Sequence, residues 1–167
     1  MRVYLPATLA MLTQLVAEGS LRAVGDTAFA VTPALREAYS YGDDDELAEV
    51  ALREAALASL RLLTATPQTP ADHPVRRAVL VADAADVTAR RDLDDAVVRL
   101  AGPVALSEVV AAYVDTAAAE PAVRAAMVVV DAADLGDEDA ELTVGDAQDH
   151  DLAWYAPQEL PFLLDLL

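Results

Sequence analysis

The residues best suited to chemistry gather near the C-terminus, in the segment DHDLAWYAPQE (149–159). This segment contains the only tryptophan, Trp154, together with Tyr155 and one of the two histidines, His150. An imidazole between two aspartates could bind a transition metal. Adjacent side chains point apart, however, and the other histidine, His73, lies far away in the sequence. We therefore predict no metal site and no cofactor.

The aromatic pair has two interpretations. On a strand, Trp154 and Tyr155 point to opposite faces, so that one enters the core while the other covers an edge or a pocket. We favour the interpretation that Trp154 is a structural anchor, because it lies beside a leucine-rich C-terminal segment. The alternative is that the pair stacks on a small molecule.

A second group of candidates follows Thr32-Pro33, which resembles a helix cap and a first-turn proline. At helical spacing, Arg36 and Tyr39 share one side of this helix. They are candidates, with Trp154 and Tyr155, for a ligand-binding pocket in which carboxylates act as acids or bases. The alternative interpretation is a surface arginine that lies over a half-buried tyrosine.

The chain beyond Arg124 has eleven acidic residues and no lysine or arginine. It does not match a calcium-binding loop, because apolar residues follow Asp131 where further carboxylates are required. A loop that begins at Asp137 lacks the required glycine and glutamate. We therefore predict a solvated acidic loop over about 134–150 and no metal site within it.

Composition excludes several classes of protein. No cysteine is present, which excludes disulfides, thiolate metal sites and cysteine nucleophiles. The serines lack the context of a hydrolase nucleophile, and the scattered glycines form no phosphate-binding loop. A net charge of -18 repels phosphate backbones and argues against nucleic acid as a partner. No apolar run reaches the length of a membrane span, about 18 residues.

The elements that must position these residues follow from the pattern of apolar residues, caps and turns. Thr8 is predicted to cap a helix that Gly19 ends. We predict strands at 3–5, 75–83, 96–102, 112–114 and 152–155, a hairpin at 21–32, and further helices at about 33–40, 44–65, 121–131 and 157–167. This order predicts an α+β fold: two layers, with a mixed sheet, a split βαβ (ferredoxin-like) core and extra helices.

The length predicts a single domain over 1–167, with a C-terminal strand and helix at 152–167. The last eight residues, LPFLLDLL (160–167), are apolar in nearly all helical directions. One packing partner covers about half of such a helix, and the remainder would stay exposed. We therefore predict a homodimer with this segment at or beside the interface.

Four blocks of the sequence, RVYLPATLAML, AFAVTPALREAY, DLGDEDAEL and DHDLAWYAPQELPFLLDLL, resemble in the same order a family of uncharacterised proteins from high-GC actinobacteria. The resemblance runs from the first residue to the last. It implies a bacterial source and a stand-alone cytoplasmic protein, and it transfers no reaction, cofactor or catalytic residue. The absence of lysine, asparagine and isoleucine, which share AT-rich codons, independently predicts a GC-rich genome.

The favoured function is a non-enzymatic protein-interaction or regulatory protein of the bacterial cytoplasm, because no nucleophile, metal or phosphate motif is found. The alternative is a small enzyme or ligand-binding protein that uses carboxylates, with its pocket near Arg36, Tyr39, Trp154 and Tyr155. A third hypothesis is a nucleic-acid mimic whose acidic face occupies a basic partner. The sequence alone leaves open whether the chain is an enzyme.

Overall fold

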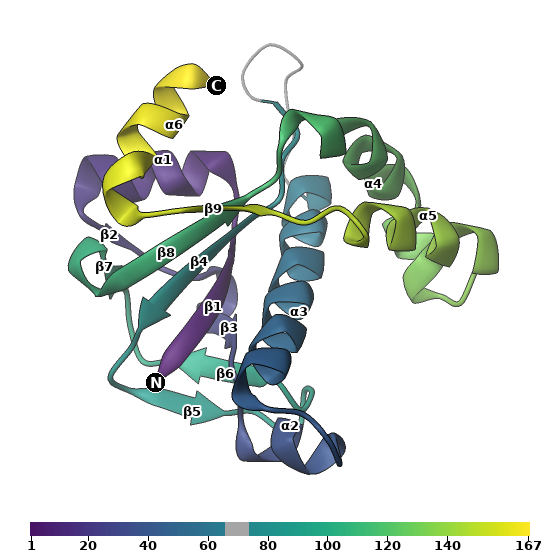
Figure 1. Cartoon of the computed structure of the whole chain (residues 1–167), viewed down its shortest axis with the longest axis horizontal. Coiled ribbons are helices and arrows are strands. Elements are labelled where there is room, and N and C mark those ends of the chain that lie inside the picture. The colour runs from purple at the N-terminus through teal and green to yellow at the C-terminus, as the bar shows by residue number, and fades with distance from the viewer. Residues whose placement is uncertain (66–73) are drawn as a thin grey trace.

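A seven-stranded sheet forms the centre of the structure. The computed structural model describes residues 1–65 and 74–167. The strands lie in the order β5–β6–β3–β1–β4–β8–β9, and each pair of neighbours is antiparallel (Figure 1). They are β1 (Arg2–Ala7), β3 (Thr27–Phe29), β4 (Ala78–Asp83), β5 (Val87–Ala89), β6 (Val97–Leu100), β8 (Val109–Val114) and β9 (Ala153–Tyr155).

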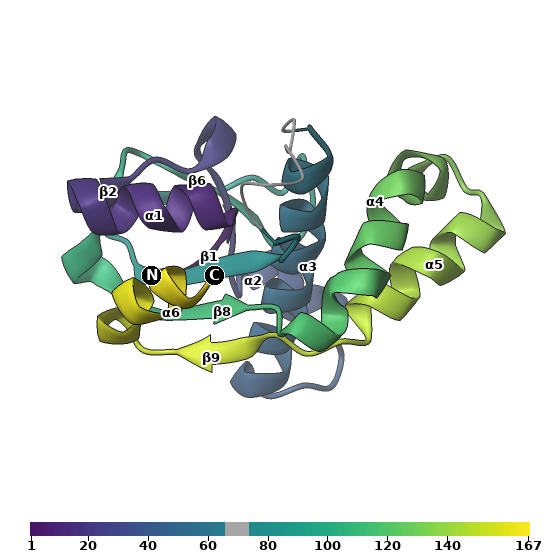
Figure 2. The same cartoon turned by 90° about the horizontal axis from the view of Figure 1, so that it is seen from above.

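Helices cover both faces of this sheet. α1 (Leu9–Glu18) and α6 (Leu160–Leu166) lie on one face, whereas α3 (Asp44–Ala65) packs on β1, β3 and β4 across the other (Figures 1 and 2). The α+β class is thus confirmed, but the predicted two layers are three. The reason lies in β4, where Leu80 faces α1 while Val79 and Val81 face α3. A strand that is apolar on both sides requires cover on both sides.

The long helical crossover joins two strands that run in the same direction. β3 and β4 are both antiparallel to β1, which lies between them, and therefore run parallel to each other. The connection consists of α2 (Pro33–Ala38) and α3, where the sequence predicted two helices. The strand in the middle, β1, precedes this unit in sequence, so the ferredoxin-like order β-α-β-β-α-β is not confirmed.

Capping residues set the helix ends where the sequence predicted them. Thr8 accepts a hydrogen bond from the backbone N–H of Met11, and Gly19 ends α1 in the left-handed region, at φ 81°. Thr32 caps α2 by accepting from the N–H of Leu35. Throughout the described ranges, no helix has both the length and the apolar character that crossing a bilayer requires.

Two local predictions near the N-terminus are corrected. β1 continues through Pro6 to Ala7 and does not end at residue 5. The segment 21–32 is not a hairpin: β2 (Ser20–Leu21) pairs with β7 (Val104–Ala105) in a separate two-stranded sheet, while β3 joins the main sheet. The turn at Gly25 and Asp26, both with positive φ, directs the chain from one sheet to the other.

The predicted acidic loop over 134–150 is mostly helix. α4 (Glu120–Asp134) is followed by α5 (Glu138–Gln148), and the two form a hairpin beside α3 (Figure 2). Asp137 caps α5 by accepting from the N–H of Ala140. Acidic side chains in the first turn also favour the helix N-terminus electrostatically. Small buried residues, Ala140 and Ala147, then let α5 pack closely against its neighbours.

A buried hydroxyl joins α3 to the two central strands. Ser59 is fully buried, donates to the carbonyl oxygen of Ala7 at 2.7 Å and accepts from the N–H of Ala78 at 3.0 Å. Ala7 and Ala78 are the last pair of the β1–β4 ladder. The serine side chain therefore satisfies backbone groups on both strands at the point where their pairing ends.

A buried ion pair joins the outer part of the sheet to the C-terminal segment. Arg77 and Asp115 are about 1% and 0% exposed, with their side chains 2.8 Å apart. The backbone N–H and Nε of Arg77 also donate to Asp115. Its Nη1 donates to the side chain of Gln148, and Nη2 donates to the carbonyl oxygen of His150. We call these four residues the Arg77 network.

We predict that Asp115→Ala lowers the free energy of unfolding by about 3–5 kcal/mol, because it leaves the Arg77 charge buried without its counter-ion. The double variant Arg77→Met/Asp115→Ala should recover part of this loss, since no unpaired charge remains. Urea unfolding measures both values. Asp134→Ala, which breaks the exposed pair with Arg61, is the control and should change little. Equal losses at the two sites would contradict the assigned role of burial.

Candidate functional site

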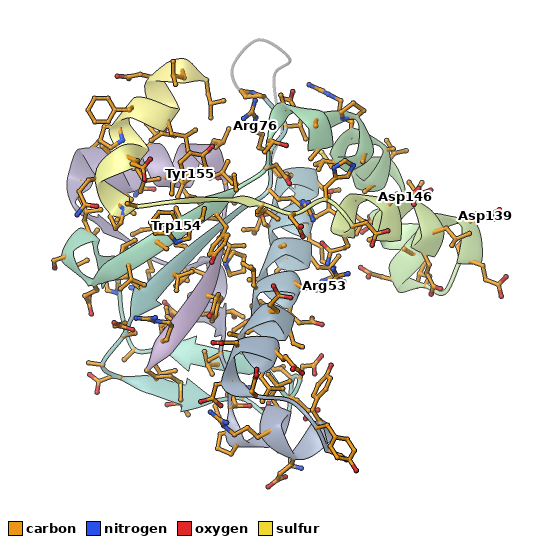
Figure 3. All side chains as sticks on the ribbon, in the orientation of Figure 1. Arg53, Arg76, Asp139, Asp146, Trp154 and Tyr155 are labelled. Atoms are coloured by element: carbon orange, nitrogen blue, oxygen red, sulfur yellow. The ribbon has the colours of Figure 1, made fainter. Side chains whose placement is uncertain are left out.

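The aromatic pair of β9 divides between the two faces of the sheet, as predicted. Tyr155 lies opposite Ala112 and packs against the core beneath α1 and α6. Trp154 lies opposite Tyr113 on the face that carries α3, and 57% of its surface is exposed. The prediction that Trp154 is a buried anchor is therefore wrong, and Tyr155 makes the contact with the core (Figure 3).

Trp154 is exposed because helical cover ends before the edge of the sheet. α3 packs on β1, β3 and β4, and β8 and β9 lie beyond it (Figure 1). Val110 and Tyr113 of β8 and Leu152 just before β9 are only partly buried. We call these three residues and Trp154 the β9 surface. It is an apolar and aromatic patch that continues the core outward to the edge.

The outer edge of β9 has no partner strand in the described parts of the chain. β9 is the last strand in the sheet order and pairs with β8 alone. Its backbone groups on the other side are therefore available to another strand. The strand itself, Ala153–Tyr155, carries no charge that would oppose such pairing.

Carboxylates lie at one end of the β9 surface. Glu49 of α3 and Asp151 before β9 are exposed and lie beside Leu152, and Asp149 nearby in the sequence is exposed too. Within the residues that the structure describes, neither Glu49 nor Asp151 forms an ion pair. Arg53 donates to the carbonyl oxygen of Gln148 at 3.2 Å. Glu49, Arg53 and Asp151 line a hollow of about 60 Å³, which is too small for an organic ligand.

The four predicted ligand-binding residues do not converge. Tyr39 follows α2 and is 46% exposed, whereas Trp154 and Tyr155 lie on the edge strand β9. Arg36 is near the N-terminus of α3, where it forms an ion pair with Asp44. It lines a hollow of about 470 Å³ to which neither Tyr39 nor the aromatic pair contributes.

Most charges of the hollow beside Arg36 are paired. Arg2 forms an ion pair with Asp83 at 3.1 Å, and this hydrogen bond and charge lower the pKa of Asp83. Tyr4 also lines the hollow, where burial and then the neighbouring Tyr113 raise the pKa of its phenol. The hydroxyl of Tyr4 is therefore protonated at neutral pH. The remaining carboxylate of the lining, Asp45, forms no ion pair among the described residues.

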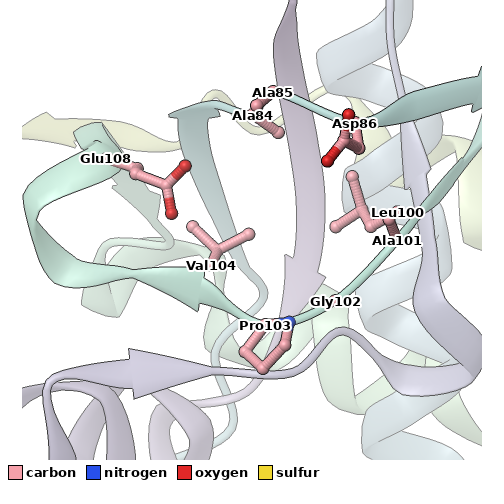
Figure 4. Close-up of a pocket in the computed structure, with 9 residues that line it drawn as sticks. All are labelled: Ala84, Ala85, Asp86, Leu100, Ala101, Gly102, Pro103, Val104 and Glu108. Atoms are coloured by element: carbon pink, nitrogen blue, oxygen red, sulfur yellow. The ribbon is translucent and has the colours of Figure 1, made fainter.

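A third hollow, of about 300 Å³, lies between the end of β4 and the loop that joins β6 to β7 (Figure 4). Its lining is apolar except for two carboxylates, Asp86 and Glu108, which lie on opposite sides (Figure 4). Glu108 already accepts a hydrogen bond from the N–H of Ala105 at 2.9 Å. Two carboxylates across a hollow could act as an acid and a base, but in this hollow one of the two, Glu108, is held by the backbone.

The segment Asp149-His150-Asp151 serves the fold through its backbone. The carbonyl oxygen of His150 accepts from Arg77, and Asp149 follows the last turn of α5. Across residues 1–65 and 74–167, no three histidine or acidic side chains are placed to hold a metal ion. His73 lies outside the described residues.

Two features of this region could not be predicted from the sequence. Nothing in it paired Arg77 with Asp115, because the two residues are 38 positions apart. Tyr113 was placed on a strand, but its pairing with Trp154 depends on the register between β8 and β9. The alternation of the strand AAYV around Tyr113 was the one available signal that this tyrosine points away from the core beneath α1.

We predict that Trp154→Ala lowers the free energy of unfolding by about 1 kcal/mol or less, because the substitution removes only the partly exposed cross-strand contact with Tyr113. Tyr155→Ala should cost more, about 2–4 kcal/mol, since it removes an aromatic ring from the core. Urea unfolding of the two variants beside the parent measures the difference. A larger loss for Trp154→Ala than for Tyr155→Ala would restore the anchor interpretation.

Comparison with known proteins gives a family and no activity. Neither the curated proteins nor the solved structures contain a match to this chain. A family model described as "Family of unknown function (DUF6912)" matches residues 1–164, which is nearly the whole chain. The resemblance to a family of uncharacterised proteins is thereby confirmed: the chain belongs to the DUF6912 family.

Proposed function

We propose that the protein is a non-enzymatic protein-interaction or regulatory protein, and that it binds its partner through the β9 surface and the open edge of β9. One observation carries the proposal: Trp154 is exposed beside Tyr113 on a strand that, among the described residues, pairs on one side alone. Tryptophan and tyrosine dominate the energetics of protein interfaces. Adding a strand to an open sheet edge is a common way to bind an extended segment.

The size of the exposed surface supports this use. Trp154 is 57% exposed, and covering its remaining area would contribute on the order of 3 kcal/mol. The indole contributes little to the fold from this position, since the core contact of β9 comes from Tyr155. A large aromatic side chain that is held by the sheet but left exposed suits an interface better than a core.

The alternative function, a small enzyme or ligand-binding protein, has less support. Its candidate residues Arg36, Tyr39 and Trp154 lie on separate elements, and Arg36 is paired with Asp44. The hollow between Asp86 and Glu108 contains none of these candidates, and Glu108 is held there by the N–H of Ala105.

We also propose that the protein acts in the cytoplasm of a high-GC actinobacterium. The absence of lysine, asparagine and isoleucine supports the GC-rich source.

Site-specific photo-crosslinking in the native cell tests the proposed surface. A photoreactive phenylalanine analogue at position 154 should give a discrete crosslinked protein, because an interface residue lies against its partner. Tyr41, which is 93% exposed and belongs to none of the surfaces described above, is the matched control position. The same analogue at position 41 should not give that product. A product common to both positions, or none at position 154, would contradict the proposal.

A homodimer is a second candidate interaction, and it would use the other face of the molecule. Leu160 and Leu163 of α6 are buried against the core, whereas Phe162 and Leu166 are 73% and 85% exposed. The latter two are one helical turn apart and form an apolar stripe along α6. Two copies of this stripe could cover each other in a symmetric pair.

We predict a dimer mass by light scattering at micromolar concentration and moderate salt. Phe162→Asp/Leu166→Asp should return it to a monomer, because it places charges in the apolar contact. Added salt should favour the dimer, since it screens the repulsion between two chains of net charge -18. A monomer mass for the parent protein under all these conditions would exclude the homodimer.

A further inference from the structure

We infer that the segment bound at β9 is basic: an extended stretch of a partner protein that carries arginine or lysine at alternate positions and adds to the sheet as a strand. This inference rests on the proposed function, because it names the chemistry of the partner for the same surface. It follows from the charges around β9, from Trp154 and Tyr113 on one face of the sheet, and from the side chains that an added strand would place over these two rings.

The charge around β9 is negative on balance. The last 43 residues contain eleven acidic side chains and no lysine or arginine. Asp149 and Asp151 precede β9 and Glu159 follows it, while Glu49 lies on α3. Arg77 is buried with Asp115, and Arg53, which donates to the carbonyl oxygen of Gln148, contributes one positive charge beside Glu49 and Asp151.

The aromatic residues on this face also favour a cation. Trp154 and Tyr113 lie opposite each other on neighbouring strands, and the indole is more than half exposed. An arginine or lysine over the face of a tryptophan is attracted to the ring, and the attraction grows when the contact excludes water. Carboxylates around an aromatic patch add a charge that attracts the same side chains.

A single added strand could contact both the carboxylates and the aromatic residues. Side chains of a strand added beside β9 would alternate between the two faces of the sheet. Every second residue would therefore lie on the face of Trp154, toward Glu49 and Asp151 beside Leu152. Cationic residues at those positions would meet both the indole and the carboxylates. The residues between them would lie on the face of Tyr155 and α6.

A second copy of this chain fits the same edge poorly. Each chain has a net charge of -18. If two β9 edges paired, each chain would bring its own Asp149, Asp151 and Glu159 to the contact. Like charges across an interface oppose association. A basic segment is favoured by the same groups that disfavour self-pairing.

Selection of random extended peptides displayed on phage, with the full-length protein as bait, tests the inference. We expect enrichment of peptides with arginine or lysine at every second position. Their affinity, measured with the synthetic peptides, should fall at least about tenfold for Trp154→Ala and remain unchanged for Tyr41→Ala, an exposed aromatic residue elsewhere. Circular dichroism and urea unfolding of each variant verify that the fold is intact.

The charge contribution has its own pair of matched variants. Glu49→Gln/Asp151→Asn should weaken binding and flatten its dependence on salt, because rim charges act over distances that salt screens. Glu18→Gln/Asp139→Asn changes the net charge equally at exposed positions on α1 and at the far end of α5 (Figure 3). This control should bind as the parent does. Equal effects of the two double variants would mean that overall charge, and not a site at β9, attracts the peptide.

The possible outcomes separate the inference from the proposed function. Peptides that depend on Trp154 but are neutral or acidic would overturn the basic partner and leave β9 as a docking edge. No enrichment, or peptides insensitive to Trp154→Ala, would overturn both. A dimer of the parent protein that Trp154→Ala dissociates would place a second copy at the edge and overturn the inference.

Discussion

The outer half of this fold depends on the burial of one charged pair, Arg77 with Asp115. A guanidinium in the core is tolerated only when its charge is balanced and its N–H groups are bound. The Arg77 network meets both requirements with groups from four places: Asp115 directly follows β8, Arg77 directly precedes β4, α5 contributes Gln148, and His150 leads into β9. The position of Trp154 at the edge therefore follows from a charge buried one strand inward.

Those parts of the fold that depend on local chemistry could be predicted from the sequence. Thr8, Gly19 and Thr32 set helix ends because caps act on backbone groups a few residues away. The bounds of α3 followed from its acidic first turn and apolar length. The helix α5 was missed because its high negative charge resembled a solvated loop, although Asp137 is a capping residue and Ala140 and Ala147 supply a small buried face.

The candidate site could be predicted only in part, because burial depends on which elements meet. Alternation on a strand placed Trp154 and Tyr155 on opposite faces, and this is confirmed. Which face is covered depends on how far α3 extends across the sheet, and no pattern within residues 149–159 contains that information. Arg36 lies on α2 and Tyr39 directly follows it, and neither contributes to the surface at β9. The family has no described function that would indicate which face of the sheet binds a partner.

The hydroxyl of Ser59 has a mechanical consequence. Pro6, which has no N–H to donate, lies one residue before the end of β1, and at Ala7 and Ala78 the serine oxygen stands between the two backbones. Through Ser59, α3 is therefore hydrogen-bonded to both central strands at the end of their ladder. Sliding α3 along the sheet would leave two buried backbone groups without partners. The position of α3 on the sheet is therefore fixed at this point, and the α4–α5 hairpin packs against the second half of a helix that cannot slide.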